Sequence, residues 1–159
     1  LTFKTRMDLD GYIKDHVVAY SIAEVSPEVI DVHNILNASI MAMHYALDHL
    51  TVRPELILVD GNKFHPYQSI PHECIVKGDA KLLSIACASI LAKNYRDRLM
   101  IALHKEFPEY GWSTNMGYAT KQHQEALNRF GPTIYHRKSF RLDYSSCEKQ
   151  SCTGNVEKI

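Results

Sequence analysis

The stretch "HECIVKGDAKLLSIACASILAK", residues 72–93, joins a short apolar run directly to a long helical pattern. The run 74–77 predicts a strand, and the pattern that follows predicts a helix from Ala80 to about Phe107. Asp79 lies at the joint between the two elements. It could cap the helix by accepting hydrogen bonds from its first backbone N–H groups, or it could bind a metal ion. The stretch alone leaves both interpretations open.

A second apolar run, "ELILVD" at 55–60, has the composition of a buried strand and also ends in an aspartate. Since Gly61 follows, Asp60 could simply begin a turn. If the two strands pair side by side, Asp60 and Asp79 come close together, and two like charges held close are costly unless a cation lies between them. Carboxylate ligands select a hard cation, Mg²⁺ or Mn²⁺, which points to phosphoryl-transfer chemistry.

The rest of the chain alternates strand and helix patterns, which is typical of an α/β protein. Small residues along the helix after Ala80, such as Ser84, Ala88 and Ala92, would let that helix approach a sheet or another helix closely. The other expected elements are a polar helix over 1–18, a strand over 17–25, a helix from Ser26 to about Leu50 whose spacing fits a short helix followed by a long one, and a helix over 120–131.

The composition fits one globular domain of 159 residues with a real core, since 45% of the residues are hydrophobic. A net charge of zero gives no support for a strongly basic surface, although a local basic patch would suffice to bind nucleic acid. Neither a membrane span nor a signal peptide is expected.

The four cysteines do not predict a disulfide framework, so a reducing, cytoplasmic setting fits the chain. Cys74 and Cys87 lie in apolar runs and are expected to be small buried side chains. Cys147 and Cys152 lie in a polar segment and lack the partners that a zinc site needs.

Two further features, Tyr118 and the run His136–Ser139, have two interpretations each, whereas Asp97 has one. Tyr118 follows a glycine in a loop, where its ring could be packed or could be exposed to stack on a sugar or base. The run His136–Ser139 could be a solvated charge run or could contact phosphates. Asp97 is eighteen residues from Asp79 on one helix, roughly 27 Å along its axis, so it cannot share a metal with Asp79 and is expected to form an ion pair.

Several segments in register resemble bacterial ribonuclease HII over about residues 1–140. They are "EVSPEVIDVHNILNASIMAMHYALDHL", "LVDGN", "IVKGDAKLLSIACASILAKNYRDRLM", "GYATKQH" and "GPTIYHRKSF". The resemblance implies a ribonuclease H-like fold that lacks its first strands and has a C-terminal helical part. It divides the chain into a partial ribonuclease HII domain at 1–143 and a polar, disordered tail at 144–159.

The same resemblance implies an endonuclease that cleaves RNA in RNA–DNA hybrids and nicks DNA on the 5′ side of embedded ribonucleotides. Cleavage would leave 5′-phosphate and 3′-hydroxyl ends and would use two metal ions, Mn²⁺ or Mg²⁺. The expected partner is an RNA–DNA hybrid or a DNA duplex with an embedded ribonucleotide. The protein is expected to be a cytoplasmic monomer that does not bind membranes.

Matched residue by residue, Asp60 and Asp79 fall on two of the four acidic residues of that family, as catalytic and metal-binding side chains. Tyr118 falls on the tyrosine that stacks on the deoxyribose following the ribonucleotide. The other positions expected to support the site or contact the nucleic-acid backbone are Asn34, Lys77, His136, Arg137 and Ser139.

One departure from the family pattern keeps alternatives open. The family carries its other two acids in an Asp-Glu-x-Gly-Arg-Gly motif on the first strand, and "MDLDGY" at 7–12 does not replace it. The chain could therefore be part of a ribonuclease HII whose N-terminal segment is absent here. It could also be a non-catalytic remnant or nucleic-acid-binding module, or a related metal nuclease of the ribonuclease HIII type.

Overall fold

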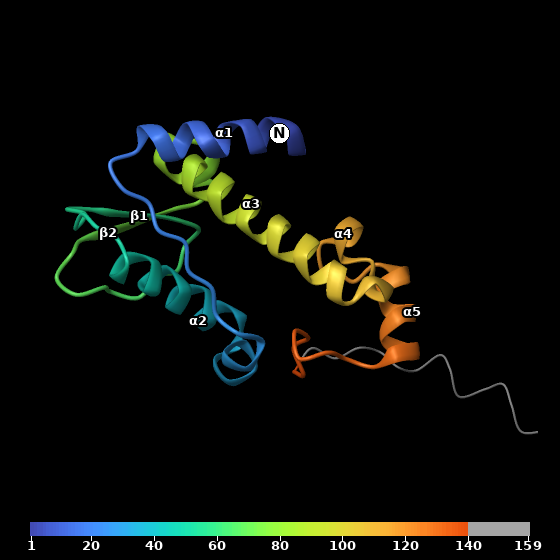
Figure 1. Ribbon diagram of the computed structural model, residues 1–159. Helices are drawn as coiled ribbons and strands as arrows, with labels where there is room; N and C mark the ends of the chain where they lie inside the picture. Colours follow the sequence, from blue (N-terminus) through green and yellow to red (C-terminus); the bar gives the residue numbers. More distant parts are fainter. Residues whose placement is uncertain (140–159) are drawn as a thin grey trace, which may run out of the picture.

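The computed structural model describes residues 1–139, so the tail expected at 144–159 lies outside the part described. Its elements are α1 (Phe3–His16), α2 (Pro27–Asp48), β1 (Ile57–Asp60), β2 (His72–Ile75), the 3₁₀ turn η1 (Gly78–Ala80), α3 (Leu83–Glu106), the 3₁₀ turn η2 (Pro108–Tyr110), α4 (Trp112–Asn115) and α5 (Lys121–Phe130). Figure 1 shows α3 as a long diagonal helix, with α1 across its first half and α4 and α5 at its far end.

The two strands pair side by side in parallel, which meets the condition under which Asp60 and Asp79 could come close together. Their register sets Ile57 opposite His72 and Asp60 opposite Ile75. Because the strands run in the same direction, their carboxyl ends meet at one edge of the sheet. β1 buries Ile57 and Val59, as expected, but β2 is not a buried strand and Cys74 is exposed.

The prediction of a strand over 17–25 is wrong. From Ala19 the chain runs as a connection without secondary structure until α2 begins at Pro27. Its β-branched composition favours extended backbone, but a strand also needs a neighbour for its hydrogen bonds. Within residues 1–139, β1 and β2 form a sheet of two strands only.

The helix after Ser26 is divided, in agreement with its apolar spacing. Asn34 interrupts α2 with a φ of 64°, and its side-chain oxygen accepts hydrogen bonds from the N–H groups of Leu36 (3.0 Å) and Asn37 (3.1 Å). Asn34 therefore caps the second, longer part of the helix.

Two hydrophobic cores lie at opposite ends of the structure. One packs the second part of α2 against β1 and the connection to β2, and consists of Ile40, Ile57, Val59, Phe64, Tyr67 and Ile70. The other packs the end of α3 against η2, α4 and α5, and consists of Met100, Leu103, Tyr110, Trp112, Ala126 and Leu127. Within residues 1–139 the last helix, α5, lies in the expected range 120–131; the Thr120 side chain caps its start and Gly131 follows its end.

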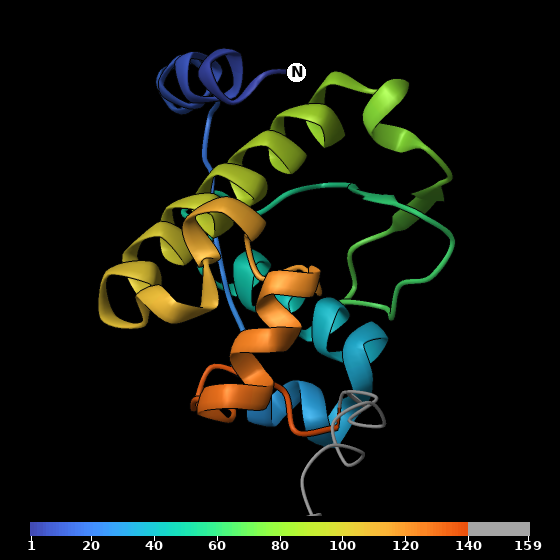
Figure 2. The ribbon, with the colours of Figure 1, turned by 90° about the vertical axis from the view of Figure 1, so that its right-hand side faces the viewer.

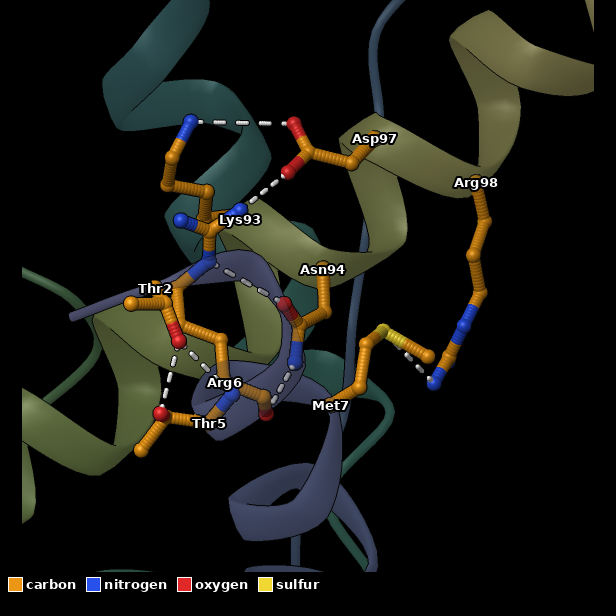
Figure 3. Close-up of polar contacts among 8 residues, drawn as sticks. All are labelled: Thr2, Thr5, Arg6, Met7, Lys93, Asn94, Asp97 and Arg98. Carbon is orange, nitrogen blue, oxygen red and sulfur yellow. Dashed lines mark hydrogen bonds and ion pairs between the residues drawn. The ribbon is translucent and has the colours of Figure 1, made fainter.

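A polar network attaches α1 to the back of α3 (Figure 3). Arg6 forms an ion pair with Asp97, and Asn94 donates a hydrogen bond to the Arg6 carbonyl (2.7 Å). The ion pair expected for Asp97 is therefore confirmed. Asp97 is only 3% exposed. Asp10, from the "MDLDGY" stretch, is buried as well and pairs with Arg98 at 2.8 Å.

Candidate functional site

The two candidate acids belong to segments that meet at the carboxyl edge of the sheet. Asp60 closes β1, and its Oδ1 accepts a hydrogen bond from the backbone N–H of Gly78 at 2.8 Å. Asp79 directly follows Gly78 in the chain and lies in the turn η1. Asp60 and Asp79 are both exposed residues, so a ligand can reach the carboxylates at this edge of the sheet.

The capping interpretation of Asp79 is wrong. α3 begins at Leu83, and Leu82 occupies its N-cap position without a side-chain hydrogen bond. The Asp79 carboxylate makes no hydrogen bond or ion pair with any residue of 1–139, whereas Asp60 is held by Gly78. Of the two acids, one is therefore oriented by the backbone and the other is open to a ligand.

The loop that carries Asp79 is pressed tightly against α3. A Cβ atom on Gly78 would lie 2.6 Å from Cδ1 of Ile85, a buried residue of the first turn of α3. The preceding residue, Lys77, has a φ of 56°, which is the left-handed conformation. This close approach explains the glycine at 78 and gives Asp79 a defined place beside β1.

The chemistry of these acids fits a hard divalent cation, although two carboxylates are a small ligand set. Among residues 1–139, no group of three or more His, Cys, Asp or Glu side chains could hold a metal ion. Mg²⁺ is commonly bound by one or two carboxylates, with waters and substrate phosphates completing its shell. Asp60 and Asp79 could therefore contribute to such a site.

An apolar groove of 580 Å³ runs from Asp60 between α2, β1 and α3. Met43 and Leu47 line it from α2, and Ala88 and Ala92 line it from α3. Ala88 and Ala92 belong to the small-residue face predicted to pack closely against a sheet or helix, yet both are exposed. Across the groove, this face of α3 looks toward β1 and α2, and Ala88 and Ala92 stay accessible within the part of the chain that the structure describes.

Tyr118 lies far along the chain from the acids, in the loop between α4 and α5. Tyr118 is 66% exposed, so the packed interpretation is wrong. Positive φ angles at Met116 (50°) and Gly117 (78°) turn the chain sharply before it. Arg96 of α3 donates a hydrogen bond to the Met116 carbonyl (3.2 Å) and so holds the loop on the helix.

The run His136–Ser139 is not simply a solvated charge run. The His136 ring packs against Tyr110, Trp112 and His123, with centroids 5.0, 5.2 and 5.3 Å away. Burial, and to a smaller extent the neighbouring His123, lowers the pKa of His136 to about 4. A neutral imidazole at neutral pH is a weak phosphate ligand. We therefore interpret His136 as the residue that anchors its segment on the helical end, and not as a phosphate contact.

The other residues predicted to contact substrate divide into two groups. The Asn34 amide is engaged in capping α2, and Ser139 uses its N–H and hydroxyl on Asp31. Lys77 and Arg137 are exposed. The substrate-binding role of each of these residues stays a prediction.

The sequence model of one protein family, Ribonuclease HII, matches residues 1–147. The protein belongs to the ribonuclease HII family. It is 56% identical over 142 residues to the ribonuclease HII of Christiangramia forsetii, a match that covers 89% of this chain and 72% of the relative. It is 50% identical over 141 residues to the ribonuclease HII of Porphyromonas gingivalis, with 89% and 70% covered. This membership confirms the resemblance to ribonuclease HII, which is a family of nucleases.

The ribonuclease HII fold is also recognisable in a solved structure. The crystal structure of the ribonuclease H2 from Pyrococcus horikoshii OT3 superimposes with a TM-score of 0.73 and 23% identity, over 88% of this chain and 74% of that one. This likeness confirms the α/β fold with its helical C-terminal part. No helix within residues 1–139 is long and apolar enough to cross a membrane.

Sequence reasoning missed Asp31 in this ribonuclease HII chain. Its carboxylate accepts hydrogen bonds from residues more than a hundred positions later in the chain. An acid near the start of a helix is ordinary, because it interacts favourably with the helix dipole. No local spacing could have indicated its partner.

Proposed function

We propose that this chain carries half of the acidic site of a ribonuclease HII endonuclease. The substrate is RNA in an RNA–DNA hybrid, or a DNA duplex with an embedded ribonucleotide, cut on the 5′ side to leave 5′-phosphate and 3′-hydroxyl ends. Family membership supports the reaction class. The observation that supports the assignment is the hydrogen bond to Asp60 from the N–H of Gly78, the residue directly before Asp79.

In this proposal Asp60 and Asp79 hold divalent cations, Mg²⁺ or Mn²⁺. When bound, such ions activate water and stabilise the leaving 3′-oxygen, as in other two-metal hydrolases. The N–H of Gly78 holds Oδ1 of Asp60, which would leave Oδ2 available to a ligand. The exposed ring of Tyr118 stacks on the sugar that follows the ribonucleotide, a contact that orients the duplex on the protein.

The domain is proposed to be completed by a strand that occupies the apolar groove. β1 has a ladder partner on one side only within residues 1–139, and the groove opens along β1. The small side chains Ala88 and Ala92 allow the backbone of a strand to approach α3 closely. More than a quarter of the Christiangramia forsetii relative lies outside the match. A strand carrying the family's Asp-Glu-x-Gly-Arg-Gly motif would end beside Asp60 and supply the two other acids.

The test joins the family's Asp-Glu-x-Gly-Arg-Gly segment to this chain and measures nicking of a duplex with a single embedded ribonucleotide in Mn²⁺. We expect nicking by the joined protein, no nicking when it carries Asp60→Asn, and little nicking by the 159-residue chain alone. A joined protein that folds but does not nick would contradict the proposal. Cleavage only of longer ribonucleotide stretches would favour the ribonuclease HIII type. Gel filtration of the same protein tests the proposed monomer.

A further inference from the structure

The proposed site is spread over two parts of the molecule. Asp60 and Asp79 belong to the sheet end, which has its own core, whereas Tyr118 belongs to the helical end, which has the other. α3 connects the two ends. A second connection runs from the helical end back to the start of α2, through the segment 133–139 (Figures 1 and 2).

Asp31 makes this second connection. Its Oδ1 accepts hydrogen bonds from the Ser139 hydroxyl (2.6 Å) and the Ser139 N–H (3.1 Å), and its Oδ2 accepts one from the Lys138 N–H (2.8 Å). One carboxylate thus satisfies three donors, two of them backbone groups. Such charge-assisted bonds are stronger than neutral ones. The hydrogen bond from the Ser139 hydroxyl is also the main reason that the pKa of Asp31 is lowered.

The other end of the segment is anchored by His136. Its Nδ1 accepts a hydrogen bond from the Thr133 N–H (2.9 Å), and its ring lies among Tyr110, Trp112 and His123 of the helical end. Arg137 lies between this aromatic anchor and the two residues that Asp31 holds. The segment is therefore fastened on both sides of a basic side chain.

We propose that Asp31 is a positioning residue for substrate binding. By holding Lys138 and Ser139 at the start of α2, it fixes the spacing between the acidic edge and Tyr118 and sets Arg137 in place along the duplex. This inference rests on the proposed function. It assigns Ser139 a role through Asp31 and not a contact with substrate of its own.

The test compares the 159-residue chain with Asp31→Ala, Ser139→Ala and the double variant. Asp15→Ala serves as a matched control, because it removes one exposed carboxylate from α1. Two quantities are measured on each protein. The first is the rate of tryptic cleavage after Arg137 and Lys138, identified by mass spectrometry. The second is the affinity for a labelled DNA duplex with one embedded ribonucleotide, followed by fluorescence anisotropy.

We expect Asp31→Ala to raise the cleavage rate at these two bonds at least about tenfold, the usual effect of losing hydrogen bonds to a charged group. The same variant should weaken duplex binding, and the double variant should behave like Asp31→Ala alone. The control should match the wild type. Addition of the two single effects on affinity would overturn the inference, since Ser139 would then contact substrate directly.

Two results separate this inference from the proposed function. Wild-type binding with unchanged cleavage and affinity in Asp31→Ala would refute the positioning role and leave the function standing. Failure of both the wild-type chain and the joined protein to bind the duplex would refute the proposed function, and the positioning role with it; if only the joined protein binds, the same variants are compared in it.

Discussion

Substituting His136 with asparagine should remove a specific part of the pH dependence of stability. In the folded protein the His136 ring is partly buried among aromatic rings, and its Nδ1 accepts the Thr133 N–H. Asparagine keeps an acceptor near that position but does not titrate. The comparison therefore isolates the cost of protonating this one side chain from that of the carboxylates that titrate at similar pH.

The magnitude follows from the lowered pKa of His136, about 4 in the folded protein against an ordinary 6.5. Above pH 6.5 the ring is neutral in both states and contributes its full stability. As the pH falls toward 4, the unfolded chain takes up a proton that the folded chain does not, so the free energy of unfolding decreases. The full gap corresponds to about 3 kcal/mol, which solvent screening of a partly buried ring reduces to about 2 kcal/mol.

The assay is urea denaturation from pH 7.5 to 4, followed by the emission of Trp112. Trp112 is the protein's single tryptophan and packs against His136. The difference in free energy of unfolding between wild type and His136→Asn should change by about 2 kcal/mol over this range, in favour of wild type at high pH. A difference that stays constant with pH would refute the reasoning, because the ring would then protonate equally in both states.

Three other substitutions test separate parts of the account. Asp97→Ala should lower the free energy of unfolding in urea by about 3 kcal/mol, because it leaves Arg6 unpaired at a mostly buried position; replacing both residues with apolar ones should restore most of it. Gly78→Ala should cost about 1–3 kcal/mol in thermal unfolding through its clash with Ile85, and Ile85→Val should relieve part of that cost. Tyr118→Ala should weaken duplex binding about tenfold while Tyr118→Phe does not, and equal binding by all three proteins would exclude stacking.

The features that the sequence predicts well are those encoded in neighbouring residues. The apolar run before Asp60 predicts a strand because burial of Ile57 and Val59 requires only one packed face. The divided helix at Asn34 follows from the spacing of apolar residues on either side. The ends of α5 follow from Thr120, whose side chain caps the first turn. In each case, the residues that determine the element lie within a single short stretch of sequence.

The features that the sequence predicts poorly depend on distant partners. The stretch 17–25 has strand composition but no strand to pair with among residues 1–139, so composition alone misleads. Asp79 has the composition of a helix cap, yet the turn η1 moves the start of α3 beyond it. The bonds between Asp31 and Ser139 join residues 108 positions apart, and no pattern of spacing records them.

Binding of one divalent cation by both Asp60 and Asp79 is the central claim, and paramagnetic broadening by Mn²⁺ tests it without requiring catalysis. Amide NMR signals are recorded while Mn²⁺ is added in small amounts to the wild-type chain and to Asp60→Asn and Asp79→Asn. The account predicts that the signals of Gly61, Gly78 and Asp79 broaden first in the wild type and that either substitution abolishes this preference. Equal broadening in all three proteins, or broadening that begins at other acidic residues, would contradict it.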